Sequence, residues 1–96
     1  MNINVTYNDD LLSCDLVYIP DQIGYQIEII AQNYLDWIPT DDLDFDWAII
    51  NGKKVLSKNT TGFVKWLNLF YCKSDNQARI IRQNIERDPT IIGVDF

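Results

Sequence analysis

Histidine is absent from this chain of 96 residues, and cysteine, proline and glycine are scarce, with two, three and four copies. Without imidazole, the chain cannot build a Ser-His-Asp triad, a Cys-His pair or a histidine-ligated metal site. Its two cysteines, Cys14 and Cys72, lie far apart and form no CxxC motif, so we expect two reduced, largely buried thiols. We predict no catalytic residue, no metal site and no cofactor, and we expect that the chain is not an enzyme.

Long apolar runs are also missing. The most apolar stretch, Phe63 to Cys72, is shorter than the ~18 residues that a membrane span needs and is interrupted by Lys65 and Asn68. The N-terminal residues lack the basic region and the apolar run of a signal peptide. We therefore expect a cytoplasmic protein with no membrane contact. The chain length predicts a single domain over residues 1–96.

Hydrophobic residues make up 47% of the chain, enough to fill one core. Residues 3–7 and 11–18 are rich in β-branched and aromatic side chains, which predicts two short strands. Asn51-Gly52 lies between two further runs of this kind and predicts a hairpin, because both central residues of a type I′ turn need positive φ. The predicted register pairs Ile50 with Lys53, Ala48 with Val55 and Trp47 with Leu56. Neither face is purely apolar, so we expect this hairpin to place one strand at the edge of a sheet.

A helix is predicted from Asp21 to Ile38. Apolar residues recur every three or four positions over this span, which places them on one helical face: Ile23, Ile27, Ile30, Tyr34 and Ile38. Asp21 is the expected N-cap and Pro39 the expected stop. Gly24 weakens the first turn, so a strand over residues 25–30 is the competing interpretation.

Two more helices are predicted in the second half. The aromatic segment 61–72 has apolar residues on both sides, which favours a helix buried nearly all round. Ser74 to Gln77 match a capping box, which predicts a second helix with Ala78, Ile81 and Ile85 inside and the arginines Arg79 and Arg82 outside. Residues 90–95 predict a closing strand. The expected fold class is α+β, a small mostly antiparallel sheet packed on about three helices in the order ββαββααβ.

Charge is distributed unevenly along the chain. Residues 1–52 contain ten acidic side chains and no basic one (−10), whereas residues 53–96 contain four acidic and eight basic ones (+4), for a net −6. Five acids fall within eleven residues, interleaved with aromatic and apolar side chains: Asp36, Asp41, Asp42, Asp44 and Asp46. These acids lack the glycine and the glutamate that a calcium loop places among them, so we predict no calcium site.

Two interpretations of the acidic segment remain open. In the first, the carboxylates form a solvated connection and protect a strand edge. In the second, they form a docking surface for a basic protein, because clustered charge speeds association and an accessible tryptophan supplies an anchor. The residues of this candidate site are Asp36, Trp37, Asp41, Asp42, Asp44 and Asp46, with Trp37 as the anchor and Trp47 assigned to the core. Direct binding of nucleic acid is not expected, because this half of the chain repels phosphate.

A short, acidic, histidine-free α+β chain rich in Ile, Asn and Asp, with the pattern of residues 44–54 and an aromatic helix at 63–71, resembles the immunity proteins of bacterial polymorphic toxins. The contact-dependent growth inhibition immunity proteins are the most similar group. The resemblance implies a cytoplasmic antitoxin that binds one cognate toxin domain, often a basic nuclease, and blocks its active site. It assigns no functional residue.

Three other functions remain alternatives, and the oligomeric state stays open. A phage-encoded acidic inhibitor that mimics nucleic acid fits the same composition, although such inhibitors usually carry a larger net charge for their length than −6. A divalent-metal hydrolase that uses carboxylates alone would bind Mg²⁺ or Mn²⁺. A structural subunit of a larger complex would co-purify with components unrelated to any toxin.

Overall fold

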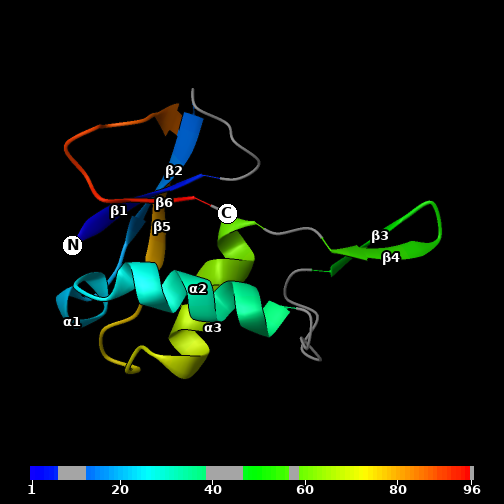
Figure 1. The fold of residues 1–96 in the computed structure, drawn as a ribbon, viewed down its shortest axis with the longest axis horizontal. Helices are drawn as coiled ribbons and strands as arrows, with labels where there is room; N and C mark the ends of the chain where they lie inside the picture. Colours follow the sequence, from blue (N-terminus) through cyan, green and yellow to red (C-terminus); the bar gives the residue numbers. More distant parts are fainter. Residues whose placement is uncertain (7–12, 39–46, 57–58, 96) are drawn as a thin grey trace.

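The computed structural model describes residues 1–6, 13–38, 47–56 and 59–95. Figure 1 shows its elements along the chain: β1 (Asn2–Thr6), β2 (Ser13–Tyr18), α1 (Asp21–Gly24), α2 (Ile27–Trp37), β3 (Trp47–Ile50), β4 (Lys53–Leu56), α3 (Thr60–Phe70), β5 (Arg79–Glu86) and β6 (Gly93–Asp95). The α+β class is therefore confirmed. The element order follows the prediction with two exceptions. Two helices, α1 and α2, stand in place of the single predicted helix, and the strand β5 stands in place of the last predicted helix.

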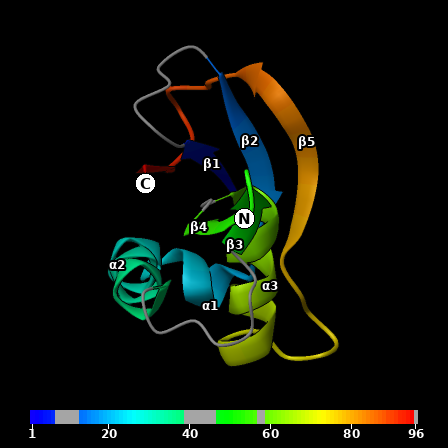
Figure 2. The same ribbon diagram turned by 90° about the vertical axis from the view of Figure 1, so that its right-hand side faces the viewer.

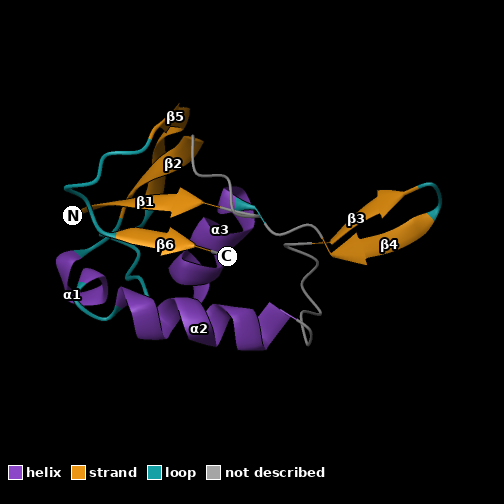
Figure 3. Cartoon of the chain, turned by 45° about the horizontal axis from the view of Figure 1, so that its top comes forward, coloured by secondary structure: helices purple, strands orange, loops and turns teal. Residues whose placement is uncertain are grey.

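The larger sheet has four strands in the order β5-β2-β1-β6. Two of its pairings are antiparallel, and β1 pairs with β6 in parallel, so the sheet is mixed. Figures 2 and 3 show that α2 and α3 lie under the same face of this sheet. The parallel β1–β6 pairing places the last strand of the chain beside the first, next to α2.

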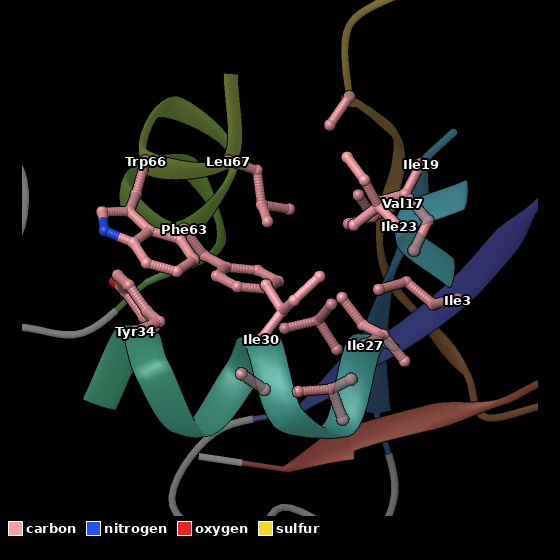
Figure 4. Close-up of a cluster of buried hydrophobic side chains, with 14 of the residues drawn as sticks. Ile3, Val17, Ile19, Ile23, Ile27, Ile30, Tyr34, Phe63, Trp66 and Leu67 are labelled. Carbon is pink, nitrogen blue, oxygen red and sulfur yellow. The ribbon is translucent and has the colours of Figure 1, made fainter. Parts of the chain in front are cut away.

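The hydrophobic core fills the space between the sheet and the helices. Figure 4 shows its side chains converging from three sides: Ile3 and Val17 from the sheet, Ile27, Ile30 and Tyr34 from α2, and Phe63, Trp66 and Leu67 from α3. The core face predicted for the region 21–38 is confirmed, because each of its five members is at most 7% exposed. Helical spacing in the sequence therefore located one wall of the core.

The predicted helix from Asp21 to Ile38 is interrupted. α1 ends at Gly24, and α2 starts at Ile27 after a turn, so the competing strand over residues 25–30 is wrong. Asp21 is not an N-cap: Pro20 holds that position, and the Asp21 carboxylate instead accepts a hydrogen bond from the amino group of Met1 at 2.8 Å. Pro39 lies outside the described residues.

The Asn51-Gly52 hairpin has the predicted turn and register. Asn51 and Gly52 have φ values of 52° and 77°, as a type I′ turn requires, and the register pairs Ile50 with Lys53. The expectation that the hairpin would place one strand at the edge of a larger sheet is not met, because among the described residues neither β3 nor β4 pairs with the four-stranded sheet. Instead β3 and β4 form a separate two-stranded sheet, which Figure 1 shows to one side of the helices.

The predicted helix after Ser74 is wrong. Residues 73–76 form a turn closed by a bridge between Lys73 and Asn76, and the following segment is the strand β5, paired with β2. Arg79 therefore lies on a strand, with its guanidinium 4.8 Å from the centre of the Tyr18 ring. The register of β5 against β2 shifts twice, and Asn84 has a φ of 55°. These irregularities break the alternation that identifies a strand in sequence.

α3 is less buried than predicted. The helix starts after an Asn59 cap, whose side-chain oxygen accepts a hydrogen bond from the Gly62 amide at 2.8 Å. It ends at Phe70 rather than Cys72. Leu69 and Phe70 are 55% and 53% exposed, so the last turn of α3 presents apolar side chains to solvent instead of burying them all round.

Asn68 fastens the start of β5 to α3. Its amide oxygen accepts a hydrogen bond from the Ala78 N–H at 2.7 Å, and its amide nitrogen donates one to the Ala78 carbonyl at 3.0 Å. Ala78 is only 4% exposed, so its backbone groups have little access to water. These two hydrogen bonds resemble those between paired strands, and they fix the position of the backbone just before β5 begins.

Replacing Asn68 by alanine is expected to lower the free energy of unfolding by about 2 kcal/mol, because two poorly hydrated backbone groups lose their partners. Urea unfolding followed by circular dichroism measures this loss. Asn68→Asp is a second variant: it keeps the acceptor for the Ala78 N–H but places a carboxylate oxygen, which cannot donate, against the Ala78 carbonyl, so it should also be less stable than the wild type. Equal stability of all three proteins would contradict the role assigned to this side chain.

Candidate functional site

The structure describes two of the six predicted site residues. Asp36 and Trp37 are the last two residues of α2, whereas Asp41, Asp42, Asp44 and Asp46 lie outside the described residues. Trp47 opens β3, but the prediction that its side chain belongs to the core also lies outside the described part. The described part of the predicted site is therefore the C-terminal end of α2.

The outer side of α2 carries acidic charge only. Asp36 is exposed, and its carboxylate accepts a hydrogen bond from Gln32 Nε2 at 3.1 Å. Glu28 is also exposed and lies eight residues earlier, about 12 Å along the axis at the rise of an α-helix. α2 contains no lysine or arginine, and neither acid forms an ion pair with another described residue. Both carboxylates therefore present negative charge to the solvent.

Two other acids of the N-terminal half have structural partners. The Asp15 carboxylate accepts hydrogen bonds from the Thr60 hydroxyl and, at 3.1 Å, from the Asn84 N–H, which ties β2 to α3 and β5. Asp21 pairs with the Met1 amino group. The four described acids of residues 1–52 are thus divided between internal ties and the outer side of α2.

Trp37 belongs to a cluster of aromatic rings at the ends of α2 and α3. Trp66, 3% exposed, is at its centre, with ring centroids of Tyr71, Tyr34 and Trp37 at 5.1, 5.2 and 6.2 Å. Phe70 lies 5.8 Å from Trp37 and 6.0 Å from Trp66. Within the described residues, the buried Trp66 Nε1 has no hydrogen-bond acceptor.

Beside these rings is an open hollow of about 450 Å³, which we call the aromatic hollow. It is lined by five residues from the two helices and the turn after α3: Asn33, Trp37, Trp66, Phe70 and Tyr71. Asn33 Nδ2 donates a hydrogen bond to the Tyr71 hydroxyl at 3.2 Å, which bridges the two sides. The predicted anchor Trp37 is thus half-buried, with packing on one side and a recess on the other.

A second apolar surface lies at the other end of α2. Tyr25 and Ile29 are 79% and 68% exposed, and together with Ile92 and Glu28 they line a hollow of about 390 Å³. Sequence reasoning missed these residues. One signal of this surface was available in the sequence. Ile29 falls between the buried positions Ile27 and Ile30, so it lies off the buried face of the helix and is an apolar residue on its outer side.

The remaining chemistry of the described residues is limited. Cys14 is buried and Cys72 half-buried, and both are thiols, as predicted. Burial raises the pKa of the Cys72 thiol, which lowers its thiolate fraction and its reactivity at neutral pH. Among the described residues, no cluster of three or more His, Cys, Asp or Glu side chains is placed to hold a metal ion. Within the same residues, every helix is too short or too polar to cross a membrane.

Comparisons of the chain with models of known protein families, with curated proteins and with solved structures each found no match. The chemistry of α2 and its neighbours is therefore the basis for assigning a function.

Proposed function

We propose that this chain is an immunity protein that binds and neutralises a basic toxin domain, with a nuclease as the expected class of toxin. The observation that carries the proposal is the outer side of α2. It combines the exposed Ile29, and Tyr25 just before the helix, with two carboxylates and has no basic residue. Large exposed apolar residues next to charge of one sign are typical of protein-binding surfaces.

The energetic roles divide between the two kinds of side chain. Glu28 and Asp36, with the acids expected beyond α2, attract a basic partner and accelerate encounter with it. Tyr25, Ile29 and Phe70 are more than half exposed, so their burial at an interface removes apolar surface from water. Charge therefore selects the partner, and the apolar side chains hold it.

Inhibition follows from occlusion. A nuclease that binds phosphate backbones has a groove rich in lysine and arginine. An acidic surface placed over this groove neutralises its charge, and the bound protein blocks entry of the substrate. This mechanism needs no catalytic group on the inhibitor.

Nucleic-acid mimicry, the alternative, is less consistent with α2. A DNA duplex carries one negative charge per ~1.7 Å of its axis. α2 presents two acidic residues about 12 Å apart along the helix axis, with the exposed Gln32 between them and Ile29 on the adjoining surface. Two isolated acids beside an exposed apolar side chain are suited to a protein partner that pairs each acid with one cation. They are less suited to a groove that binds a polyanion through its high charge density.

Co-expression tests the proposal directly. The C-terminal domain of a secreted toxin encoded immediately upstream is expressed from an inducible promoter in cells with and without this chain. We expect growth arrest without the chain and normal growth with it. The control is a chain truncated within α2, which should not protect. Continued arrest in cells that contain the folded full-length chain would refute the proposed function.

A further inference from the structure

We propose that the aromatic hollow binds an arginine side chain of the basic partner. This inference rests on the proposed function for the source of the arginine, but the hollow itself is defined by Asn33, Trp37, Trp66, Phe70 and Tyr71. Four of the five lining residues are aromatic and none is charged. The recess therefore offers ring surfaces, and any charge in it must come from the ligand.

The exposed rings suit a planar cation. Phe70 and Tyr71 are 53% and 38% exposed, so parts of both rings face solvent rather than the core. The negatively charged faces of aromatic rings attract cations, and a guanidinium group also stacks on them through its flat surface. A purely apolar ligand would not benefit from this attraction between the ring faces and positive charge.

The lining of the hollow includes one acceptor, and the adjoining surface of α2 carries another. Asn33 uses its Nδ2 to donate to the Tyr71 hydroxyl, and among the described residues no donor contacts its Oδ1. Asp36 follows Asn33 at i+3, on the neighbouring part of the same helical surface, and its carboxylate is exposed. A guanidinium has five N–H donors and no acceptor, so an amide oxygen and a carboxylate are suitable partners for it.

Two helix ends add negative potential at the same place. α2 ends at Trp37 and α3 ends at Phe70, and both of these residues line the hollow. The C-terminus of each helix carries a partial charge of about −0.5 from its unpaired carbonyl groups. Neither last turn contains a basic residue that would neutralise this charge. The polarity of the backbone thus favours a cation over a neutral or anionic ligand.

Arginine is the expected cation rather than lysine. A lysine ammonium is a compact, strongly hydrated charge, whereas a guanidinium is planar, more weakly hydrated and able to stack while it donates sideways. The hollow presents rings along its walls, with one acceptor in its lining and another on the adjoining surface of α2, which matches the second geometry. We therefore expect the affinity for arginine to exceed that for lysine by about two- to fivefold, the range of a solvent-exposed cation–π contact.

The test is an NMR titration of the full chain with small probes. N-acetyl-arginine amide, N-acetyl-lysine amide and the neutral isostere N-acetyl-citrulline amide are added to ¹⁵N-labelled protein. We expect saturable shifts of the indole N–H signals of Trp37 and Trp66 and of the Asn33 side-chain amide with arginine, weaker binding with lysine, and no saturable shift with citrulline. Equal shifts with arginine and citrulline, or no saturation with arginine, would overturn the inference.

Two matched variants of α3 show where on the protein the arginine probe binds. Phe70→Ala removes a lining ring and should weaken arginine binding by about two- to fivefold, whereas Leu69→Ala, which is equally exposed but outside the hollow, should not change it. Circular dichroism confirms that both variants are folded. If both bind arginine as the wild type does, the hollow is not the site. If Phe70→Ala weakens binding of the arginine probe but binds a catalytically inactive toxin domain as tightly as the wild type does, no arginine of the partner occupies the hollow, and the proposed function stands.

Discussion

Replacing Phe63 by alanine is expected to lower the free energy of unfolding by about 3–5 kcal/mol, the range for a buried aromatic residue. Phe63 is fully buried at the junction of the core and the aromatic cluster, with its ring centroid 5.0 Å from that of Tyr34 and 6.3 Å from that of Trp66. Its loss leaves a cavity between α2 and α3. Because small domains have a total stability of about 5–15 kcal/mol, a large share of the folding free energy depends on this ring.

Phe70→Ala is the matched control for Phe63→Ala. It makes the same substitution on the same helix at a position that is 53% exposed, and among the described residues it breaks the ring contacts with Trp37 and Trp66. We expect a loss of about 1 kcal/mol. Urea unfolding followed by tryptophan fluorescence and circular dichroism measures both values. Similar losses at the two positions would show that α3 is buried on both sides, contrary to the exposure described above.

The sequence predicted the core well because the helix period is regular in α2. Ile27, Ile30 and Tyr34 follow the helix repeat, and tertiary packing did not alter it. The hairpin was predictable for a local reason: only residues that tolerate positive φ complete a type I′ turn, and Asn51-Gly52 supplies both. In both cases the information lies within a few neighbouring residues.

β5 was not predictable in the same way. Opposite β2, Ile80 pairs with Val17 and Arg82 with Leu16, so two steps along β5 correspond to one step along its partner. A second shift follows before Ile85, near the positive φ of Asn84. Each extra residue reverses the faces of the side chains that follow. After these shifts the isoleucines of this segment are spaced as they would be on one face of a helix. The pairing with β2, some 65 residues earlier in the chain, makes the segment a strand.

The candidate site was only partly predictable. Asp36 and Trp37 were identified from the cluster of acids with interleaved aromatic residues; both lie in the last turn of α2, and Trp37 lines the aromatic hollow. Phe70 and Tyr71 were assigned to a buried helix, because an apolar stretch in sequence does not reveal where a helix leaves the core. Both residues lie at the C-terminal end of α3, which Figure 2 shows as the end farther from the sheet, and the point where a helix leaves the core depends on the lengths of several elements at once.

Reversing both acids of α2, Glu28→Lys with Asp36→Lys, is expected to slow association with the basic toxin domain by about ten- to a hundredfold at low salt, because electrostatic steering changes from attraction to repulsion. The fold should tolerate the change. Glu28 lies in the first turn of α2, where lysine is unfavourable to the helix dipole, and Asp36 lies in the last turn, where lysine is favourable. The two effects oppose each other, so we expect the free energy of unfolding to stay within about 0.5 kcal/mol of the wild type.

The control variant has the same net charge as the α2 variant. Asp75→Lys with Glu86→Lys changes the total charge by the same amount on exposed residues away from α2, so a difference between the two double variants reports position rather than charge. Stopped-flow association with a catalytically inactive toxin domain, at low salt and at ~0.15 M, measures the rates. Because the Debye length is only ~8 Å at the higher concentration, the deficit of the α2 variant should shrink there. Normal association of the α2 variant, combined with loss of binding when Lys53, Lys54 and Lys58 are reversed, would move the interface to the basic half of the chain.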